Sequence, residues 1–477
     1  MKFLYSILLA TLCALSTEVS AEEHPLTLKE AIQLMLRQHP ALEAATQGVA
    51  IARHERRAAK GLYAPEVVIE GGYSHLQRPI GLNLNGAKTP LKNLLSTSFT
   101  PAFEELLTPL LQSDWQLTLQ QRNVAVAGIG VTVPLWMGGR IHAANRAAEL
   151  QIELSQASRH SVQDRLYTEL IVRYFGLALA QEATAVKSQA LDVLQGHMRN
   201  AEQLEQEGMI ARSERLYVAY RLSEAQRDYD SSLLQCATLS RALQTSLGID
   251  SLNTSLRPIT SLFVVDSLPS ISYFTRCATA NNPLLRRSEL AVQLSREEVR
   301  AKRAAFFPEI VALGGGVVCD YQLSGMAPRW AVGISLRFML FDGFRRNEQY
   351  RIAKLTTTRY ETLECEAHEA MRALIEEYYN KLQAARDEFY TMQKSLDFAY
   401  AYLRDQRIAF CEGIISAIVL LDAELEYAAV RLKRLEAAYH FVVALAQLLE
   451  AVGVSDTIGT YLHSIFTQSV TFQIDQP

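Results

Sequence analysis

The sequence predicts a mixed α and β membrane protein built from two copies of one unit, each with a strand pair and a long antiparallel helical hairpin. Three observations predict this class. The chain repeats itself at constant offsets, one stretch alternates strictly between large apolar and small or polar residues, and long stretches contain almost no Pro or Gly. Two strands per copy are too few to close a hydrophobic core, so lipid or other subunits must complete the sheet.

The internal repeat changes its offset once along the chain. Pro65 corresponds to Pro308 at an offset of 243 residues, whereas Gly208 corresponds to Gly413 at an offset of 205 residues. The difference places about 38 extra residues in the first copy, between Pro65 and Gly138. The sequence therefore predicts one shared plan, with a longer loop in the first copy.

The N-terminal residues 1–21 have the pattern of a signal peptide. Lys2 precedes the apolar stretch Phe3–Leu15, and small residues lead up to Ala21, where a signal peptidase would cleave. We therefore expect an exported protein. After this segment no uninterrupted run of about 18 apolar residues occurs, so the sequence predicts no membrane-spanning helix.

The first copy is assigned to residues 22–250. It should begin with a helical stretch at Leu28–Gly61, continue with strands at residues 65–76 and 124–135, and end with a helix at Arg140–Gln206 whose partner returns to Gly248. The extra loop lies between these two strands, at residues 77–122. Its apolar segment, residues 99–115, is expected to form a short amphipathic helix.

A linker, residues 251–271, leads to the second copy at residues 272–453, and residues 454–477 form a C-terminal segment. This copy should begin with a helix at Ser272–Ala305 and continue with strands at residues 308–321 and 330–341. In its final helix, apolar residues recur at alternating spacings of four and three, as in a coiled coil. They are Leu421, Leu425, Ala428, Leu432, Leu435, Tyr439, Val442, Ala446 and Leu449.

The clearest strand in the sequence covers residues 330–341. Every second residue is large and apolar, whereas the residues between them are small or polar over most of this length. We expect the apolar residues to face lipid: Trp330, Val332, Ile334, Leu336, Phe338 and Leu340.

Composition and motifs give no catalytic, cofactor-binding or metal-ligating set. The 47 Lys+Arg and 51 Asp+Glu residues leave a net charge of −4, which argues against nucleic-acid binding. His54-Glu55 and His368-Glu369 lack the second His of a zinc-protease helix, so both pairs should be exposed helix residues. We expect no enzyme, no cofactor and no metal.

The motifs together resemble the TolC family of outer-membrane efflux channels over essentially the whole mature chain. The matching segments are Leu26–Ala31, His39–Leu42, Asn282–Leu285, Phe306–Glu309 and Leu340–Gly343. The resemblance implies a homotrimer in which each chain contributes four strands to a 12-stranded β-barrel in the outer membrane and two helical hairpins to a periplasmic α-barrel. It also implies a periplasmic adaptor and an inner-membrane pump, acting in a tripartite efflux or type I secretion system.

The same resemblance identifies the hairpin tips as the closed periplasmic end and the adaptor-docking surface. The docking residues would be Gly208, Met209, Gly413 and Ile414. The gate residues would be Glu214, Asp422, Phe410, Ile415 and Val419. The last three are apolar where charged or tyrosine residues are typical of the family, so we expect closure mainly by apolar packing, with Glu214 and Asp422 as the remaining charges.

Two alternatives stay open at the level of the sequence. Glu214 and Asp422 could be solvated charges on exposed helix faces, which are common. The chain could also be an exported coiled-coil scaffold that tethers envelope layers. A scaffold explains the heptad pattern but not the alternation in residues 330–341.

Overall fold

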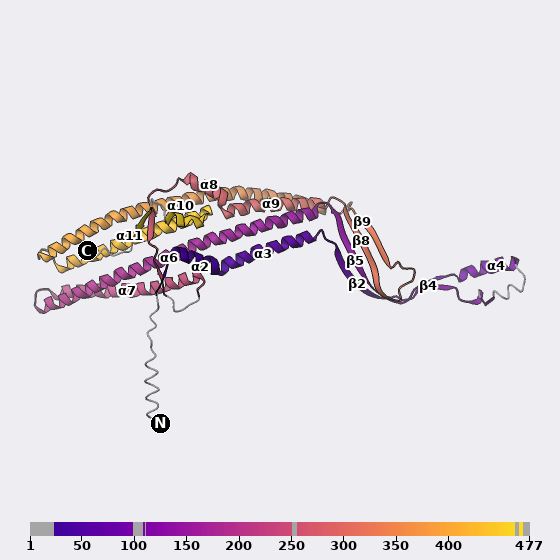
Figure 1. Ribbon diagram of the computed structural model, residues 1–477, viewed down its shortest axis with the longest axis horizontal. Coiled ribbons are helices and arrows are strands. Elements are labelled where there is room, and N and C mark those ends of the chain that lie inside the picture. The colour runs from indigo at the N-terminus through magenta and orange to yellow at the C-terminus, as the bar shows by residue number, and fades with distance from the viewer. Residues whose placement is uncertain (1–22, 99–107, 110, 250–254, 463–466, 471–477) are drawn as a thin grey trace, which may run out of the picture. The chain divides into compact units, whose positions relative to one another are not determined.

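The computed structural model describes residues 23–98, 108–109, 111–249, 255–462 and 467–470 (Figure 1). The predicted signal peptide lies outside the described residues. The chain divides into two compact units. Unit 1 contains residues 1–52, 152–292 and 360–477, and unit 2 contains residues 53–151 and 293–359.

Unit 2 contains a four-stranded antiparallel sheet with the order β2-β5-β8-β9. Its strands are β2 (Glu66–His75), β5 (Asn123–Met137), β8 (Glu309–Tyr321) and β9 (Trp330–Arg337). Each predicted strand pair is confirmed, since β2 pairs with β5 and β8 pairs with β9. The two copies of the repeat are joined where β5 pairs with β8.

Glycines allow β5 and β8 to approach each other closely. A Cβ atom on Gly128 would lie 2.9 Å from the carbonyl oxygen of Gly316, and one on Gly315 would lie 2.9 Å from that of Ile129. Any larger residue would push the two backbones apart. The glycine-rich stretches of these strands are therefore required by the pairing of the two copies.

The last predicted strand is shorter than we expected. β9 ends at Arg337, so Phe338 and Leu340 lie beyond the strand, and their prediction as strand residues is wrong. Arg337 pairs with Glu309, the first residue of β8. Pro308 lies directly before this strand and has no backbone N–H that could donate to a continued ladder.

The extra loop of the first copy connects β2 to β5 through residues 76–122, whereas residues 322–329 connect β8 to β9. This places the length difference where the change of offset predicts it. The loop contains a hairpin of β3 (Ile80–Asn83) and β4 (Gln116–Gln120), together with η1 (Asn85–Ala87) and α4 (Lys88–Ser98). The described helix thus precedes the predicted segment 99–115, much of which lies outside the described residues.

Both helical stretches that precede the strands are interrupted at a proline. The first is divided into α2 (Leu28–Gln38) and α3 (Pro40–Gly61), and the second into α8 (Ile271–Asn281) and α9 (Pro283–Ala304). The residue before each proline is extended: ψ is 120° at both His39 and Asn282. A proline disfavours the helical conformation of the residue before it, which accounts for both breaks.

The two helical hairpins have the same lengths in both copies. α6 (Arg140–Gln206) and α10 (Arg345–Cys411) each contain 67 residues, and α7 (Arg212–Leu247) and α11 (Ala417–Val452) each contain 36. All the predicted seam residues of α11 are buried or half-buried. This confirms the coiled-coil pattern.

α11 is the one described helix that is long and apolar enough to cross a membrane by length and composition. Of the residues in its most apolar 18-residue stretch, 67% are buried inside the structure. α11 reaches this mean hydropathy although it contains no uninterrupted run of about 18 apolar residues. The burial shows why α11 is so apolar: it packs at the centre of the helical core rather than on its surface.

The core of unit 1 also contains short strands that the sequence pattern does not predict. β1 (Glu23–Leu26) pairs in parallel with β6 (Ser255–Pro258), and β7 (Leu262–Val265) pairs antiparallel with β10 (Thr467–Val470). All four residues of β7 are buried. Phe263 packs edge-on against Phe175 of α6 at a centroid distance of 6.2 Å. η2 (Ser455–Thr457) and α12 (Ile458–Leu462) follow α11.

Candidate functional site

The hairpin turns adopt the same conformation in both copies. Gly208 and Gly413 have φ angles of +71° and +72°, which glycine tolerates best. The amides of Met209 and Ile414 donate to carbonyls five residues earlier, at 2.8 and 2.9 Å. Met209 and Ile414 are exposed. The turns lie at the same end of unit 1 (Figure 1).

Charged residues surround the first turn. Glu214 is half-buried in the first turn of α7, where the helix dipole favours a negative charge. Arg215 donates from Nε to the carboxylate of Glu205 on α6, so an ion pair closes the base of the turn.

Asp422 of α11 contacts two residues of α7, and this links the two hairpins. The hydroxyl of Tyr217 donates to Asp422 Oδ1 at 3.4 Å, and Arg221 Nη2 lies 3.5 Å from the same oxygen. Arg221 Nε also donates to the Tyr217 hydroxyl at 3.1 Å. The sequence pattern predicts a role for Asp422 but not for Tyr217 and Arg221, although the spacing of four between these two places them on one helix face.

The three apolar gate residues have different environments within one chain. Ile415 is half-buried and packs with a small cluster of Leu403, Leu420 and Ala423 inside the second hairpin. Phe410 and Val419 are exposed. Ile415 therefore packs inside its hairpin, whereas Phe410 and Val419 each keep 39% of their surface exposed to neighbouring molecules.

A second polar link lies beside Asp422. Glu424 accepts from His197 Nε2 at 3.2 Å and from Arg407 Nη2 at 3.4 Å, which connects α11 to α6 and α10. Burial favours the neutral carboxyl, but the hydrogen bonds and positive charges of these two partners outweigh it and hold the pKa of Glu424 below its ordinary value of 4.5. The Glu424 carboxylate is therefore ionised at neutral pH.

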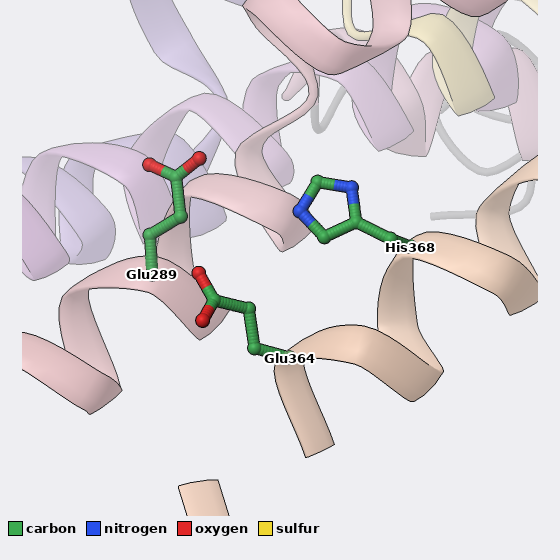
Figure 2. Close-up of side chains that lie close together, drawn as sticks. All are labelled: Glu289, Glu364 and His368. Atoms are coloured by element: carbon green, nitrogen blue, oxygen red, sulfur yellow. The ribbon is translucent and has the colours of Figure 1, made fainter. Parts of the chain in front are cut away.

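The expectation that both His-Glu pairs would be exposed is only partly correct. His54, Glu55 and Glu369 are exposed, but His368 is half-buried. His368 lies on α10 beside α9, close to Glu289 and Glu364 (Figure 2). The packing of α9 against α10, which the local sequence pattern does not reveal, accounts for the difference.

The strand face predicted to contact lipid is exposed in the single chain. Val332 and Ile334 of β9 retain 76% and 72% of their surface, and Trp330 and Leu336 are likewise exposed. β2 at the other edge carries exposed Val67 and Ile69. Each edge strand pairs on one side only within the described sheet. An apolar sheet with open edges is typical of strands that lipid and further strands cover.

These features are typical of a subunit of an outer-membrane channel. In such a subunit, strands of a membrane β-barrel are followed along the chain by long helical hairpins. The sequence profile of the family described as outer membrane efflux protein matches residues 31–249 and 276–454. The chain belongs to this family. The two matched segments correspond to the two copies of the repeat.

Curated relatives and solved structures agree with this assignment. Protein CyaE of Bordetella pertussis is 22% identical over 436 residues, covering 90% of this chain and 84% of CyaE. The alkaline protease secretion protein AprF of Pseudomonas aeruginosa is 25% identical over 325 residues, covering 65% of this chain and 66% of AprF.

Two solved outer-membrane channels share the fold. MtrE of Neisseria gonorrhoeae, in an open state, has a TM-score of 0.69 and 18% identity, covering 90% of this chain and 89% of MtrE. CmeC of Campylobacter jejuni also has a TM-score of 0.69, with 15% identity, covering 90% of this chain and 86% of CmeC. The protein is thus an outer-membrane efflux protein with its helical part in the periplasm, and the resemblance to the TolC family is confirmed. Its family consists of channel proteins, in agreement with the expectation that it is not an enzyme.

Proposed function

We propose that three copies of this chain form a continuous tube through which a periplasmic adaptor and an inner-membrane pump export a solute. The observation that carries this proposal is the four-stranded sheet with two open edges and an exposed apolar face. Closing the sheet into a barrel removes both edges, and lipid covers the apolar face. Three sheets of four strands give the 12-stranded barrel that the resemblance implies.

The helical hairpins would extend this conduit across the periplasm. At a rise of about 1.5 Å per residue, helices of the length of α6 and α10 reach roughly 100 Å. Gly208, Met209, Gly413 and Ile414 form the exposed turns at their ends and are the proposed docking surface for the adaptor. The relative AprF is named for secretion of an alkaline protease, so a secreted protein is one candidate cargo.

The test separates a channel from a scaffold. The mature protein is extracted from outer-membrane fractions, run unheated and heated on SDS gels, and reconstituted in planar bilayers. We expect a heat-modifiable trimer and discrete conductance steps. A species found only in soluble periplasmic fractions, without conductance, would instead establish the tethering scaffold.

We further propose that the tip closes through two kinds of contact. Asp422 with Tyr217 and Arg221 would hold the hairpins of one chain together, while exposed Phe410 and Val419 would pack against neighbouring chains. Ile415 would support this packing from inside its hairpin, and Glu214 would add charge at the first tip. A ring of three Asp422 carboxylates would also favour cations over anions.

The gate is tested by single-channel recording of Arg221→Ala and Asp422→Ala. Both variants remove the Arg221–Asp422 ion pair, whereas Arg221→Ala leaves the Tyr217–Asp422 contact. We therefore expect each to raise the conductance or the open time, Asp422→Ala at least as much, and the double variant to add little to Asp422→Ala. Arg227→Ala is the matched control, because Arg227 lies on the same helix and pairs with Asp228 and Glu224 of that helix. Conductance unchanged in both test variants would rule out this link as part of the gate.

A further inference from the structure

Three potential metal ligands converge between α9 and α10. Glu364 and His368 lie four residues apart on α10, so their side chains project from the same helix face. Glu289 reaches toward them from α9. One ligand atom from each residue lies within 4.8 Å of the other two, and Figure 2 shows the imidazole and the two carboxylates gathered between the helices.

The side chains of this cluster are available to a ligand. Among the residues that the structure describes, neither the Glu364 carboxylate nor the His368 imidazole has a hydrogen-bond or ion-pair partner. Glu289 accepts from Arg286 Nη1 through Oε2 at 3.0 Å, which leaves its Oε1 free for another contact. Arg286 in turn pairs with Glu153 at 2.6 Å.

The local charge favours a cation. Arg286 pairs with two carboxylates, those of Glu289 and Glu153, and Glu364 adds a third carboxylate that has no ion-pair partner among the described residues. The three ligand residues are half-buried, so solvent and salt screen their charges less than at an open surface. The region therefore carries an excess of negative charge that Arg286 does not fully neutralise.

The donor types select the class of cation. Mg²⁺ and Ca²⁺ prefer oxygen ligands only, whereas an imidazole with carboxylates suits first-row transition metals such as Zn²⁺. At Zn–ligand distances of about 2.1 Å, tetrahedral geometry places ligand atoms about 3.4 Å apart. The most widely separated donors must approach each other by up to about 1.4 Å, which rotation of the two flexible Glu side chains can supply.

We propose that Glu289, Glu364 and His368 bind a divalent transition metal, with Zn²⁺ as the best match, and that the bound ion cross-links α9 to α10. Three protein ligands leave the fourth position to water. The site contributes rigidity to the helical part of the channel. It is separate from the proposed gate residues, which lie at the hairpin tips.

The test is metal binding by the full-length mature protein in detergent, freed of its purification tag and treated with chelator. Zn²⁺ is titrated by calorimetry, and Co²⁺ is added as a spectroscopic probe. We expect one Zn²⁺ per chain, visible Co²⁺ d–d bands, and a higher unfolding temperature with Zn²⁺ that Mg²⁺ does not reproduce. Absence of Zn²⁺ binding by the wild-type protein would overturn the proposal without any variant.

Variants locate the site. His368→Ala, Glu364→Gln and Glu289→Gln should each weaken Zn²⁺ binding at least tenfold and abolish the Co²⁺ bands. Glu369→Gln and Cys365→Ser are matched controls, because both residues are exposed on α10 close to His368 and should leave binding unchanged. Wild-type affinity in the His368 variant, or equal losses in the controls, would assign the ion to another place. Heat-modifiable trimers on gels verify that each variant is folded.

Discussion

At the scale of single residues, Asp164 has a buried carboxylate whose negative charge is only partly stabilised by neighbouring groups. Its side chain lies on α6 with a residue exposure of 3%, and its Oδ2 lacks a hydrogen-bond partner among the described residues. Burial raises the pKa of Asp164, and the nearby His160, whose Nε2 is 3.5 Å away, together with hydrogen bonding from Ser455 offsets this only in part. The charged form is therefore unfavourable in the folded protein.

We predict that Asp164→Asn stabilises the protein at neutral pH by about 1 kcal/mol. Because the folded-state pKa lies above the unfolded value of 3.8, the wild-type carboxyl costs stability as the pH rises through the folded pKa. The advantage of the variant in denaturant melts should accordingly grow as the pH rises above the unfolded value of 3.8 and level off above the folded-state pKa. Asp192→Asn, at an exposed position of the same helix, is the control. An advantage that is constant with pH would contradict the assignment.

At the scale of elements, β9 shows how one strand serves two environments. Ile334 belongs to the apolar series of alternate residues, and Ser335 points to the opposite side of the sheet. If the apolar face contacts lipid, a charge is costly on that face and tolerated on the other. The same strand thus supplies both the test and its control.

We predict that Ile334→Arg destabilises the membrane-inserted form by about 2–4 kcal/mol, the usual cost of Arg on the lipid face near the membrane centre. Ser335→Arg should cost much less. The measurement is the amount of heat-modifiable trimer recovered from outer-membrane fractions. Equal recovery of the two variants would show that β9 does not present this face to lipid.

At the scale of the whole molecule, the edge strands β2 and β9 lie at opposite ends of the four-stranded sheet. Strands in a sheet are about 4.8 Å apart, so three spacings separate the two edges by about 14 Å in a sheet that is not strongly curved. A disulfide requires Cα atoms within about 7 Å. A disulfide between β2 and β9 should therefore form only between chains.

We predict that cysteine pairs placed on both edges cross-link the assembly into a ladder that ends at three chains. Val67 or Ile69 on β2 is combined with Val332 or Ile334 on β9, after the exposed Cys319, Cys365 and Cys411 are replaced by Ser. Each single cysteine variant should give no ladder. A ladder that ends at two chains, or continues past three, would contradict the trimer.

The sequence by itself determined the duplication, the four main strands and the two helical hairpins. These features depend on local periodicity and on glycine and proline positions, such as Gly208, Gly413 and the prolines Pro65 and Pro308 that precede β2 and β8. Strict alternation also identified the exposed apolar face of β9 as far as Arg337. The end of β9 was missed because it depends on the partner strand β8. Pro308, just before β8, has no backbone N–H that could continue the hydrogen bonding between the two strands.

Only the tertiary structure decided which distant residues meet. β7 pairs with β10 across some 200 residues, Asp422 meets Tyr217 and Arg221 from the other copy, and Glu289 meets His368 from a separate helix. A spacing such as that of Glu364 and His368 shows which side chains share a helix face. It does not show what that face contacts, because contacts between helices depend on how the whole chain packs.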